Sequence, residues 1–230
     1  MKLAIIGYGK MGRLIDQLAP EYGFTVHARV DVGEDFSQAA GADAAIEFTT
    51  PEAVCGNVEK LAALKLPVVV GTTGWLGHMD QVRSLTEKNG TALIWSPNFS
   101  VGVNVFLRVV REAARLLADE KEYGAWAWEI HHDTKKDAPS GTMLKLVEEM
   151  KAAGYPRNID VSSNRAGRHP GTHEIGFDSA ADTITLRHAA RSREGFARGA
   201  LKAAQWLVEN QKTDRKQGVF EFSDVLFTKR

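Results

Sequence analysis

The sequence contains a single cysteine, Cys55. A single cysteine excludes an internal disulfide and any zinc or iron-sulfur cluster held by several thiolates of one chain. We expect Cys55 to be a buried, unreactive thiol. No apolar run approaches the roughly 18 to 20 residues that cross a bilayer, and the apolar stretch at residues 3–6 is too short for a signal-peptide core. The sequence therefore predicts a cytoplasmic protein.

The chain also lacks an excess of either charge, since 29 lysines and arginines balance 29 aspartates and glutamates. No overall field draws such a protein to nucleic acid or to an anionic membrane. The 230 residues suffice for one or two domains. The apolar fraction of 43% and the charged fraction of 25% exclude general disorder. We expect an ordinary globular protein with no nucleic-acid or membrane partner.

The first hundred residues alternate short apolar runs with helical patterns, which is typical of a parallel sheet with crossover helices. Thr50, Pro51 and Glu52 offer an N-cap, a first-turn proline and an early acid for one of these helices. The pattern predicts a Rossmann-type, doubly wound parallel α/β sheet, with strands over residues 2–6, 25–30, 44–48, 67–71 and 91–95.

A different pattern follows residue 98 and predicts a second, α+β domain built on a mixed sheet. A helix is expected over residues 103–117, a strand over 124–130 and a polar connection over 157–171. Two antiparallel strands are expected over residues 174–177 and 183–188. A long helix then leads to residues 219–222, which can return to the edge of the first sheet. We expect a dinucleotide-binding domain over residues 1–98, completed by 193–230, and a substrate-binding and oligomerisation domain over 99–192.

A glycine-rich loop joins the first predicted strand to the first predicted helix and reads Gly7-Tyr8-Gly9-Lys10-Met11-Gly12. The G-x-G-x-x-G spacing lets backbone amides and a helix N-terminus approach a pyrophosphate. Asp31 ends the second strand about 20 residues later, where an acid accepts hydrogen bonds from a ribose. These features predict NADH or NADPH as cofactor, with NADH favoured because Asp31 repels a 2′-phosphate. Lys10 or Arg29 can attract that phosphate and leaves the choice open.

Two further loops follow the fourth and fifth predicted strands, at the carboxyl edge where open α/β sheets bind ligands. The first contains Gly71, Thr72 and Thr73, and the second contains Pro97, Asn98 and Phe99. Their composition alone fits plain turns equally well. Their position favours a role in binding the nicotinamide carboxamide.

A dense polar segment, residues 129–142, lies between a strand and a helix of the second domain. It holds the pair His131 and His132, two lysines and the turn Asp-Ala-Pro-Ser-Gly-Thr. Free amides and hydroxyls at the helix start, helped by a lysine, can bind a carboxylate. A histidine beside lysines should have a lowered pKa unless a bound anion offsets them. Solvated or structural histidines remain the alternative for such a pair taken alone.

The string His-His-x-x-Lys-x-Asp-Ala-Pro-Ser-Gly-Thr at residues 131–142 resembles the signature of the 4-hydroxy-tetrahydrodipicolinate reductase family, nicotinamide-dependent enzymes of lysine and diaminopimelate biosynthesis. The resemblance extends over nearly the whole chain, through Asn98-Phe-Ser-Val-Gly102, Arg165-x-Gly167, Gly171-x-His173 and His188-Ala-Ala-Arg191. The compact glycine loop departs from the longer form of many members.

The resemblance implies a small cyclic dicarboxylate substrate with a C=N bond, which takes hydride at ring carbon 4 and a proton at the neighbouring carbon. It implies His131 as the general acid and Lys135 as the second catalytic residue. It also implies substrate binding by His132, Lys135, Ser140, Gly141 and Thr142, and a homotetramer assembled through the second domain.

Three alternatives remain from the residues themselves. A dehydrogenase of the same plan could act on another amino or hydroxy acid, although the absence of Tyr-x-x-x-Lys disfavours the short-chain type. A dinucleotide-binding redox sensor without turnover is a second alternative. A metal site from His169 and His173 with the 131/132 pair is a third, which the turn at Pro170-Gly171 disfavours, so we expect no metal.

Overall fold

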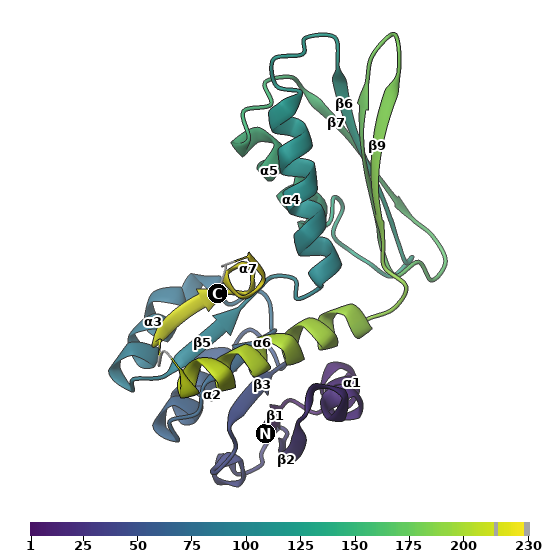
Figure 1. Ribbon diagram of the computed structural model, residues 1–230. Helices are drawn as coiled ribbons and strands as arrows, with labels where there is room; N and C mark the ends of the chain where they lie inside the picture. Colours follow the sequence, from purple (N-terminus) through teal and green to yellow (C-terminus); the bar gives the residue numbers. More distant parts are fainter. Residues whose placement is uncertain (214–215, 228–230) are drawn as a thin grey trace. The chain divides into compact units, whose positions relative to one another are not determined.

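The computed structural model describes residues 1–213 and 216–227, and its chain divides into two compact units. The first comprises Met1–Ser100 with Glu194–Arg230, and the second comprises Val101–Arg193. Figure 1 labels the elements of both.

The first unit is a parallel sheet of six described strands in the order β10-β5-β4-β3-β1-β2. Its strands are β1 (Lys2–Ile6), β2 (Thr25–Val30), β3 (Ala44–Glu47), β4 (Val68–Val70), β5 (Ala92–Trp95) and β10 (Gly218–Glu221). Its helices are α1 (Lys10–Leu18), α2 (Val54–Ala63), α3 (Met79–Lys88), α6 (Glu194–Lys212) and α7 (Phe222–Phe227), with short 3-10 turns at Ala19–Tyr22, Phe36–Ala39 and Leu76–His78.

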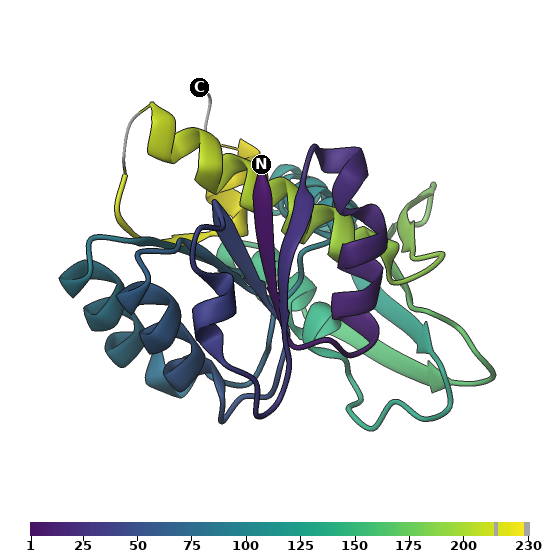
Figure 2. The same cartoon turned by 90° about the horizontal axis from the view of Figure 1, so that it is seen from below.

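Burial on both faces explains the apolar strands of this unit. Leu3 and Ile5 pack into the core with residues of α1 and α6, whereas Ala4 and Ile6 pack with residues of α2 and α3. Figure 2 shows helices on both faces of this sheet. A strand that helices cover on both faces has no solvent-facing side, so its apolar residues need not alternate with polar ones. The predicted doubly wound sheet is confirmed, including the return of β10 to its edge beside β5.

The second unit is a mixed sheet in the order β7-β6-β8-β9, with α4 (Val101–Leu116) and α5 (Gly141–Ala152) against one face. Its strands are β6 (Gly124–His131), β7 (Ile159–Arg165), β8 (Thr172–Asp178) and β9 (Thr183–Ala189). β6 runs parallel to β7 and antiparallel to β8, and β8 runs antiparallel to β9, as expected for those two strands.

Two predictions about individual elements are wrong. The expected connection over residues 157–171 contains the seven-residue strand β7, whose sequence IDVSSNR has too few apolar residues to be recognised as one. The helix expected to be capped by Thr50 begins instead at Val54, with no side-chain cap. Its first residues form a turn in which the Ala53 amide donates to the Thr50 carbonyl at 3.1 Å.

None of the described helices is long and apolar enough to cross a membrane.

Candidate functional site

The glycine loop of the first unit leaves one segment of backbone open to a ligand. A Cβ on Gly7, whose φ is +89°, would lie 2.1 Å from the Phe48 carbonyl oxygen, and one on Gly12 would lie 2.2 Å from the Gly7 carbonyl oxygen. A Cβ on Gly9 would meet no atom within 4 Å. The outer glycines therefore hold the turn and the helix packing, while Gly9 leaves room for a pyrophosphate beside the amides of α1, which has no side-chain cap. The loop fits a dinucleotide.

The neighbouring charged residues at β2 are already arranged in pairs. Arg29 forms a side-on bidentate ion pair with Asp16 of α1, with N–O distances of 2.7 and 2.8 Å. The Tyr8 hydroxyl donates to the same carboxylate. Asp31 is exposed directly after β2, and its Oδ1 accepts from the Val32 amide at 2.9 Å. The carboxylate of Asp31 is thus exposed after β2, whereas the guanidinium of Arg29 is held by Asp16.

The other residues of the glycine loop divide between core and surface. Met11 and the ring of Tyr8 are partly buried against the core of the first unit, whereas Lys10 is exposed at the start of α1. Only Lys10 among the three offers a charged side chain to an anion.

Of the two threonines after β4, Thr72 points into the protein and Thr73 to the surface. The Thr49 amide donates to the Thr72 hydroxyl oxygen at 2.7 Å, and the Trp75 indole donates to the Thr72 carbonyl at 2.9 Å. Beneath them lies the fully buried Glu47, whose pKa is raised by burial against the opposing hydrogen bonds of Thr49 and its neighbours. The side chain of Thr73 is therefore better placed than that of Thr72 to meet a cofactor, while Gly71 is half-buried between them and β4.

The loop after β5 is fixed by its own polar groups. The Asn98 side-chain oxygen accepts from the Ser100 amide at 2.9 Å, and the Ser96 hydroxyl donates to the Asn98 carbonyl at 2.8 Å. The Phe99 ring is buried against Phe222, with ring centroids 5.0 Å apart. Phe99 is buried as a whole residue and its carbonyl oxygen packs against Gly199, whereas Pro97 is exposed.

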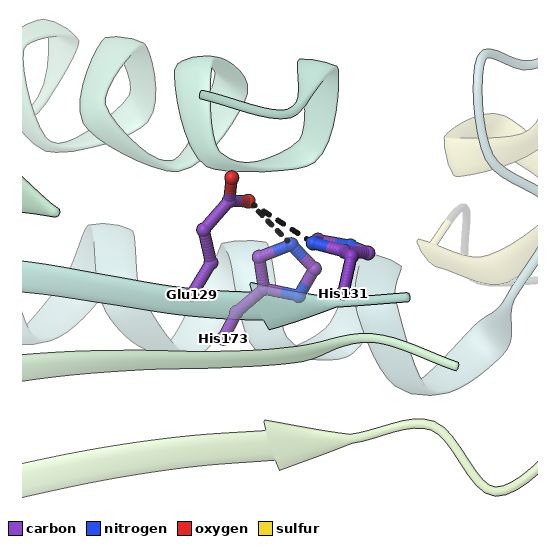
Figure 3. A group of neighbouring side chains, drawn as sticks. All are labelled: Glu129, His131 and His173. Atoms are coloured by element: carbon purple, nitrogen blue, oxygen red, sulfur yellow. Dashed lines mark ion pairs between the residues drawn. The ribbon is translucent and has the colours of Figure 1, made fainter. Parts of the chain in front are cut away.

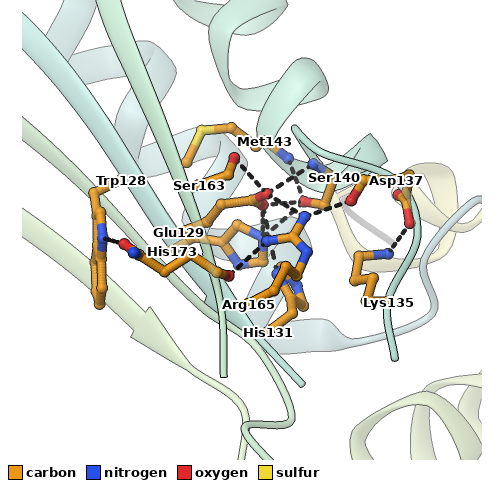
Figure 4. A network of polar contacts seen from close by, with 11 residues as sticks. Trp128, Glu129, His131, Lys135, Asp137, Ser140, Met143, Ser163, Arg165 and His173 are labelled. Carbon is orange, nitrogen blue, oxygen red and sulfur yellow. Dashed lines mark hydrogen bonds and ion pairs between the residues drawn. The ribbon is translucent and has the colours of Figure 1, made fainter. Parts of the chain in front are cut away.

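In the second unit, strand register brings polar residues together beneath α5. Glu129 of β6 lies opposite Ser163 of β7 and His173 of β8, and His131 lies opposite Arg165. Because side chains alternate along a strand, Glu129 and His131 share the face that α4 and α5 cover. Figure 3 shows Glu129, His131 and His173 pointing toward one another, and Figure 4 shows the surrounding polar network.

The carboxylate of Glu129 is fully buried and saturated with donors. Its Oε1 accepts from the Ser140 amide, the Ser163 hydroxyl and the Arg165 guanidinium, each at 2.9 Å, and its Oε2 accepts from the Ser140 hydroxyl. Burial alone would raise the pKa of Glu129. The bonds from His173, Ser140 and Arg165 outweigh burial and hold the pKa far below its usual range, so the carboxylate is ionised.

His131 ends β6 with its ring buried between this carboxylate and His173. Its Nδ1 lies 3.6 Å from Glu129 Oε2, and the two imidazole centroids are 5.0 Å apart. A Cβ on Gly171 would lie 2.9 Å from His131 Nε2, so a glycine is needed for the chain to pass this ring. Burial lowers the pKa of His131 to about 4; Glu129 opposes this, while His173, Lys135 and Arg165 add to it. The direction agrees with the sequence-based expectation, although burial rather than lysine is the main cause.

The residues expected to bind a substrate carboxylate instead contact two carboxylates of the protein itself, those of Glu129 and Asp137. Ser140 caps α5 and donates both its amide and its hydroxyl to Glu129. The expectation that these groups are free to bind a ligand is therefore wrong. Lys135 Nζ lies 2.7 Å from Asp137 Oδ1. The pKa of Asp137 is lowered first by Lys135 and also by the Gly141 backbone amide.

The remaining two candidates lie at the edges of this group. His132 is half-buried, and its Nδ1 is 2.7 Å from the Thr134 hydroxyl. Thr142 is half-buried in the first turn of α5. Both belong to the loop and helix start that hold Lys135 and Gly141.

The donor atoms of Glu129, His131 and His173 lie within 4.8 Å of one another, a spacing that a divalent metal can bridge. Both oxygens of Glu129 already accept hydrogen bonds, however, and the positive charge of Arg165 opposes a second cation. His169, considered as a ligand from the sequence, is exposed and lies outside this group. The arrangement fits proton chemistry better than metal binding.

Sequence reasoning did not assign the network around His131. Glu129 precedes His131 by two residues in a strand, and this period-2 spacing was a usable signal that they share a face. Arg165 and Ser163 lie on the strand that was not recognised, and His173 depends on the pairing of β6 with β8. Contacts between strands of this kind cannot be predicted from short stretches of sequence.

Comparison with known proteins agrees with the resemblance of residues 131–142. Residues 1–99 match the family described as "Dihydrodipicolinate reductase, N-terminus", and residues 102–226 match "Dihydrodipicolinate reductase, C-terminus". The chain is 33% identical over 243 residues to the 4-hydroxy-tetrahydrodipicolinate reductase of Christiangramia forsetii, with 98% of each chain covered. It is 36% identical over 265 residues to that of Archaeoglobus fulgidus, with 98% of this chain and 100% of the relative covered.

A solved structure shares the fold. The dipicolinate-bound dihydrodipicolinate reductase from Paenisporosarcina sp. TG-14 superposes with a TM-score of 0.75 at 20% identity, over 96% of this chain and 97% of the other. Since the two family matches span both units and the two relatives exceed 30% identity over almost the full length, this chain belongs to the dihydrodipicolinate reductase family of oxidoreductases.

Proposed function

We propose that this protein reduces 4-hydroxy-tetrahydrodipicolinate to tetrahydrodipicolinate, in lysine and diaminopimelate biosynthesis, with His131 as the proton donor. Membership of the family and two relatives named for this activity support the reaction. The observation that carries the residue assignment is the burial of His131 against the ionised Glu129, within a segment that also presents Lys135. A proton donor and a cation on one short segment suit an anionic, conjugated imine.

The pairing of Lys135 with Asp137 supports a carboxylate-binding role for this segment. The ammonium group and the Gly141 amide both act on the Asp137 carboxylate. We propose that a substrate carboxylate takes the place of Asp137 there, with further contacts from His132 and Thr142, whereas Ser140 acts through Glu129. Lys135 then also withdraws electron density from the C=N bond, which helps the ring accept a hydride. The relative from Paenisporosarcina, whose structure contains dipicolinate, supports a dicarboxylate ligand.

The charge state of His131 couples the proton transfer to substrate binding. With a pKa of about 4, the free imidazole is neutral near pH 7 and has no acidic proton to give. A dicarboxylate bound next to it raises its pKa, because the negative charge stabilises the imidazolium. Glu129 acts in the same direction, so His131 takes up a proton when the substrate is bound and delivers it to the ring carbon beside the reduced position.

The reductase family and the glycine loop support a nicotinamide dinucleotide as cofactor, which supplies the hydride when bound. We propose NADH as the preferred form. Asp31 presents a carboxylate at the end of β2, where it can accept hydrogen bonds from the ribose and repel a 2′-phosphate. We assign the exposed Thr73 and Pro97 and the half-buried Asn98 of the two edge loops to the nicotinamide end.

We also propose a homotetramer assembled through the β6–β9 sheet. The helices α4 and α5 cover the face of β6 that carries Ala127 and Glu129. Trp126 and Trp128 lie on the opposite face and remain partly exposed. Large aromatic side chains are enriched in protein interfaces. Light scattering coupled to size exclusion tests this, and a monomeric mass at micromolar concentration would contradict it.

The function is tested by following NADH oxidation at 340 nm, with substrate made freshly by the preceding synthase. We expect turnover that depends on synthase product, with NADPH run in parallel. Binding of NADH without substrate-dependent oxidation would contradict the reductase and favour a sensor. Turnover with other amino or hydroxy acids alone would favour a different dehydrogenase.

A further inference from the structure

We propose that Asp16 determines the cofactor preference of this enzyme, because it holds Arg29 away from the position of the NADPH 2′-phosphate. This inference rests on the proposed use of a nicotinamide cofactor. It adds to Asp31 a second determinant of the preference, which lies in α1, outside both the glycine loop and β2.

The side chains that carry the inference come from three elements of the first unit. Arg29 projects from β2 and Asp16 from α1, and they share two charge-assisted hydrogen bonds of 2.7 and 2.8 Å. Tyr8 lies in the glycine loop, donates its hydroxyl to Asp16, and has the Arg29 guanidinium carbon 5.8 Å from its ring centroid. The pair therefore lies against the cofactor loop.

The pair is fixed by charge as well as by geometry. The hydrogen bond from Arg29 lowers the pKa of Asp16 against the effect of burial, and Tyr8 lowers it further. Asp16 is thus ionised at neutral pH and neutralises Arg29. Because both Nε and Nη2 of the guanidinium face Asp16, the edge of the group that best binds a phosphate in a forked manner is occupied.

Arg29 would otherwise be well placed to select NADPH. Arg29 lies in β2 and Asp31 directly follows the strand, so the extended chain separates their Cα atoms by about 6.6 Å, and both residues are exposed. An arginine near the acid of this position is the group that accommodates a 2′-phosphate in dinucleotide-binding folds. The Arg29 side chain is 47% exposed, which leaves it free to turn toward Asp31 once its partner is removed. Asp16 is the partner that prevents this.

Asp16→Ala and Asp16→Asn test the inference through binding in the absence of substrate. We expect isothermal titration to show that the dissociation constant for NADPH falls about 10- to 100-fold relative to that for NADH, the range of one charge-assisted hydrogen bond. The ratio of kcat/KM for the two cofactors should shift in the same direction. Adding Arg29→Ala to Asp16→Ala should return the binding ratio to the wild-type value, since Arg29 is the group released.

Glu21→Gln is the matched control. Glu21 is the partner of Arg198 at 2.7 Å and follows the C-terminal end of α1, away from the glycine loop. The change removes one negative charge from an arginine pair of the same unit, and the cofactor ratio should not move. Thermal unfolding of each variant shows that it is folded.

The outcomes separate this inference from the proposed function. If wild-type protein binds neither dinucleotide, the proposed function fails. If it binds NADH but Asp16→Ala leaves the ratio unchanged, Asp16 is only a structural partner of Arg29 and the inference is overturned. An equal shift in Glu21→Gln would also overturn it, because the effect would then come from net charge alone.

Discussion

The Oε2 atom of Glu129 lies 3.6 Å from Nδ1 of His131, and both groups are buried on one face of β6. The carboxylate is held by Ser140, Ser163 and Arg165, so it cannot turn away from the ring. A fixed negative charge at this distance favours the imidazolium over the neutral imidazole. Glu129 is therefore a positioning residue that acts through His131 rather than on the substrate.

Glu129→Gln should lower kcat about 10-fold or more and move the alkaline fall of kcat to lower pH, because the imidazolium of His131 loses its carboxylate. The variant should also unfold at a lower temperature, since Arg165 loses a buried partner. Ser163→Ala is the control, because it removes one hydrogen bond from an uncharged donor to Glu129 and leaves the carboxylate charge in place. If kcat falls while the pH profile stays in place, Glu129 serves only stability.

His131→Gln should reduce kcat by roughly 10² to 10⁴, the usual contribution of a general acid, with little change in the dissociation constant for NADH. Glutamine keeps a polar side chain but cannot supply a proton. Steady-state kinetics and a separate NADH titration check the two parts. A variant that retains more than half of the wild-type kcat would remove His131 from the proposed chemistry.

The sequence predicted well those features that depend on short stretches of chain. The apolar strands β1 and β4, the partly exposed edge strand β2 and the strand character of β10 follow from local composition. The strand β7 was missed, because residues that lie beside a buried polar cluster need not be apolar. Two of its residues, Ser163 and Arg165, donate to Glu129 of β6, so the failure to predict the strand and the failure to predict the network have one physical cause.

The site was predictable only in its contiguous parts. His131, Lys135 and Ser140 belong to one segment, and their types indicate anion and proton chemistry. That Ser140 donates to Glu129, and not to a free anion pocket, depends on how α5 packs on the sheet. Likewise, the Arg29–Asp16 pair depends on α1 lying against β2, which no short sequence pattern specifies.

The pH dependence of kcat and that of kcat/KM should differ. His131 must be protonated to act, so activity falls as pH rises through its pKa, which is about 4 in the free protein. The profile of kcat/KM reports the free enzyme, whereas that of kcat reports the substrate complex. Because a bound dicarboxylate raises this pKa, kcat should hold to higher pH than kcat/KM. Coincident profiles would show that substrate does not alter the protonation of His131.

Lys135→Ala should lower kcat/KM about 10- to 100-fold, mainly through a higher KM, since a charge-assisted hydrogen bond contributes about 1.5 to 3 kcal/mol. Removing Lys135 also leaves Asp137 as an uncompensated negative charge where the substrate carboxylate should bind. Lys136→Ala, which removes the adjacent exposed ammonium group, is the control for net charge. Equal kinetics for the two variants would show that Lys135 has no particular role.

Pyridine-2,6-dicarboxylate should bind to this protein more tightly when NADH is present. It carries two carboxylates on a ring of the substrate's size but does not accept the hydride, so it forms a stable complex. Hydride transfer requires that cofactor and substrate touch, and ligands that touch contribute to each other's binding free energy by equal amounts. The usual scale of such coupling is about 1 to 3 kcal/mol, or roughly 5- to 150-fold in affinity.

Calorimetric titration of the analogue with and without NADH measures this coupling, and titration of NADH with and without the analogue must give the same factor. Lys135→Ala should weaken binding of the analogue in both titrations, and the affinity for NADH in the absence of the analogue should not change. Equal affinities with and without NADH would contradict direct contact between the two ligands, and no binding in either case would remove the dicarboxylate site around Lys135.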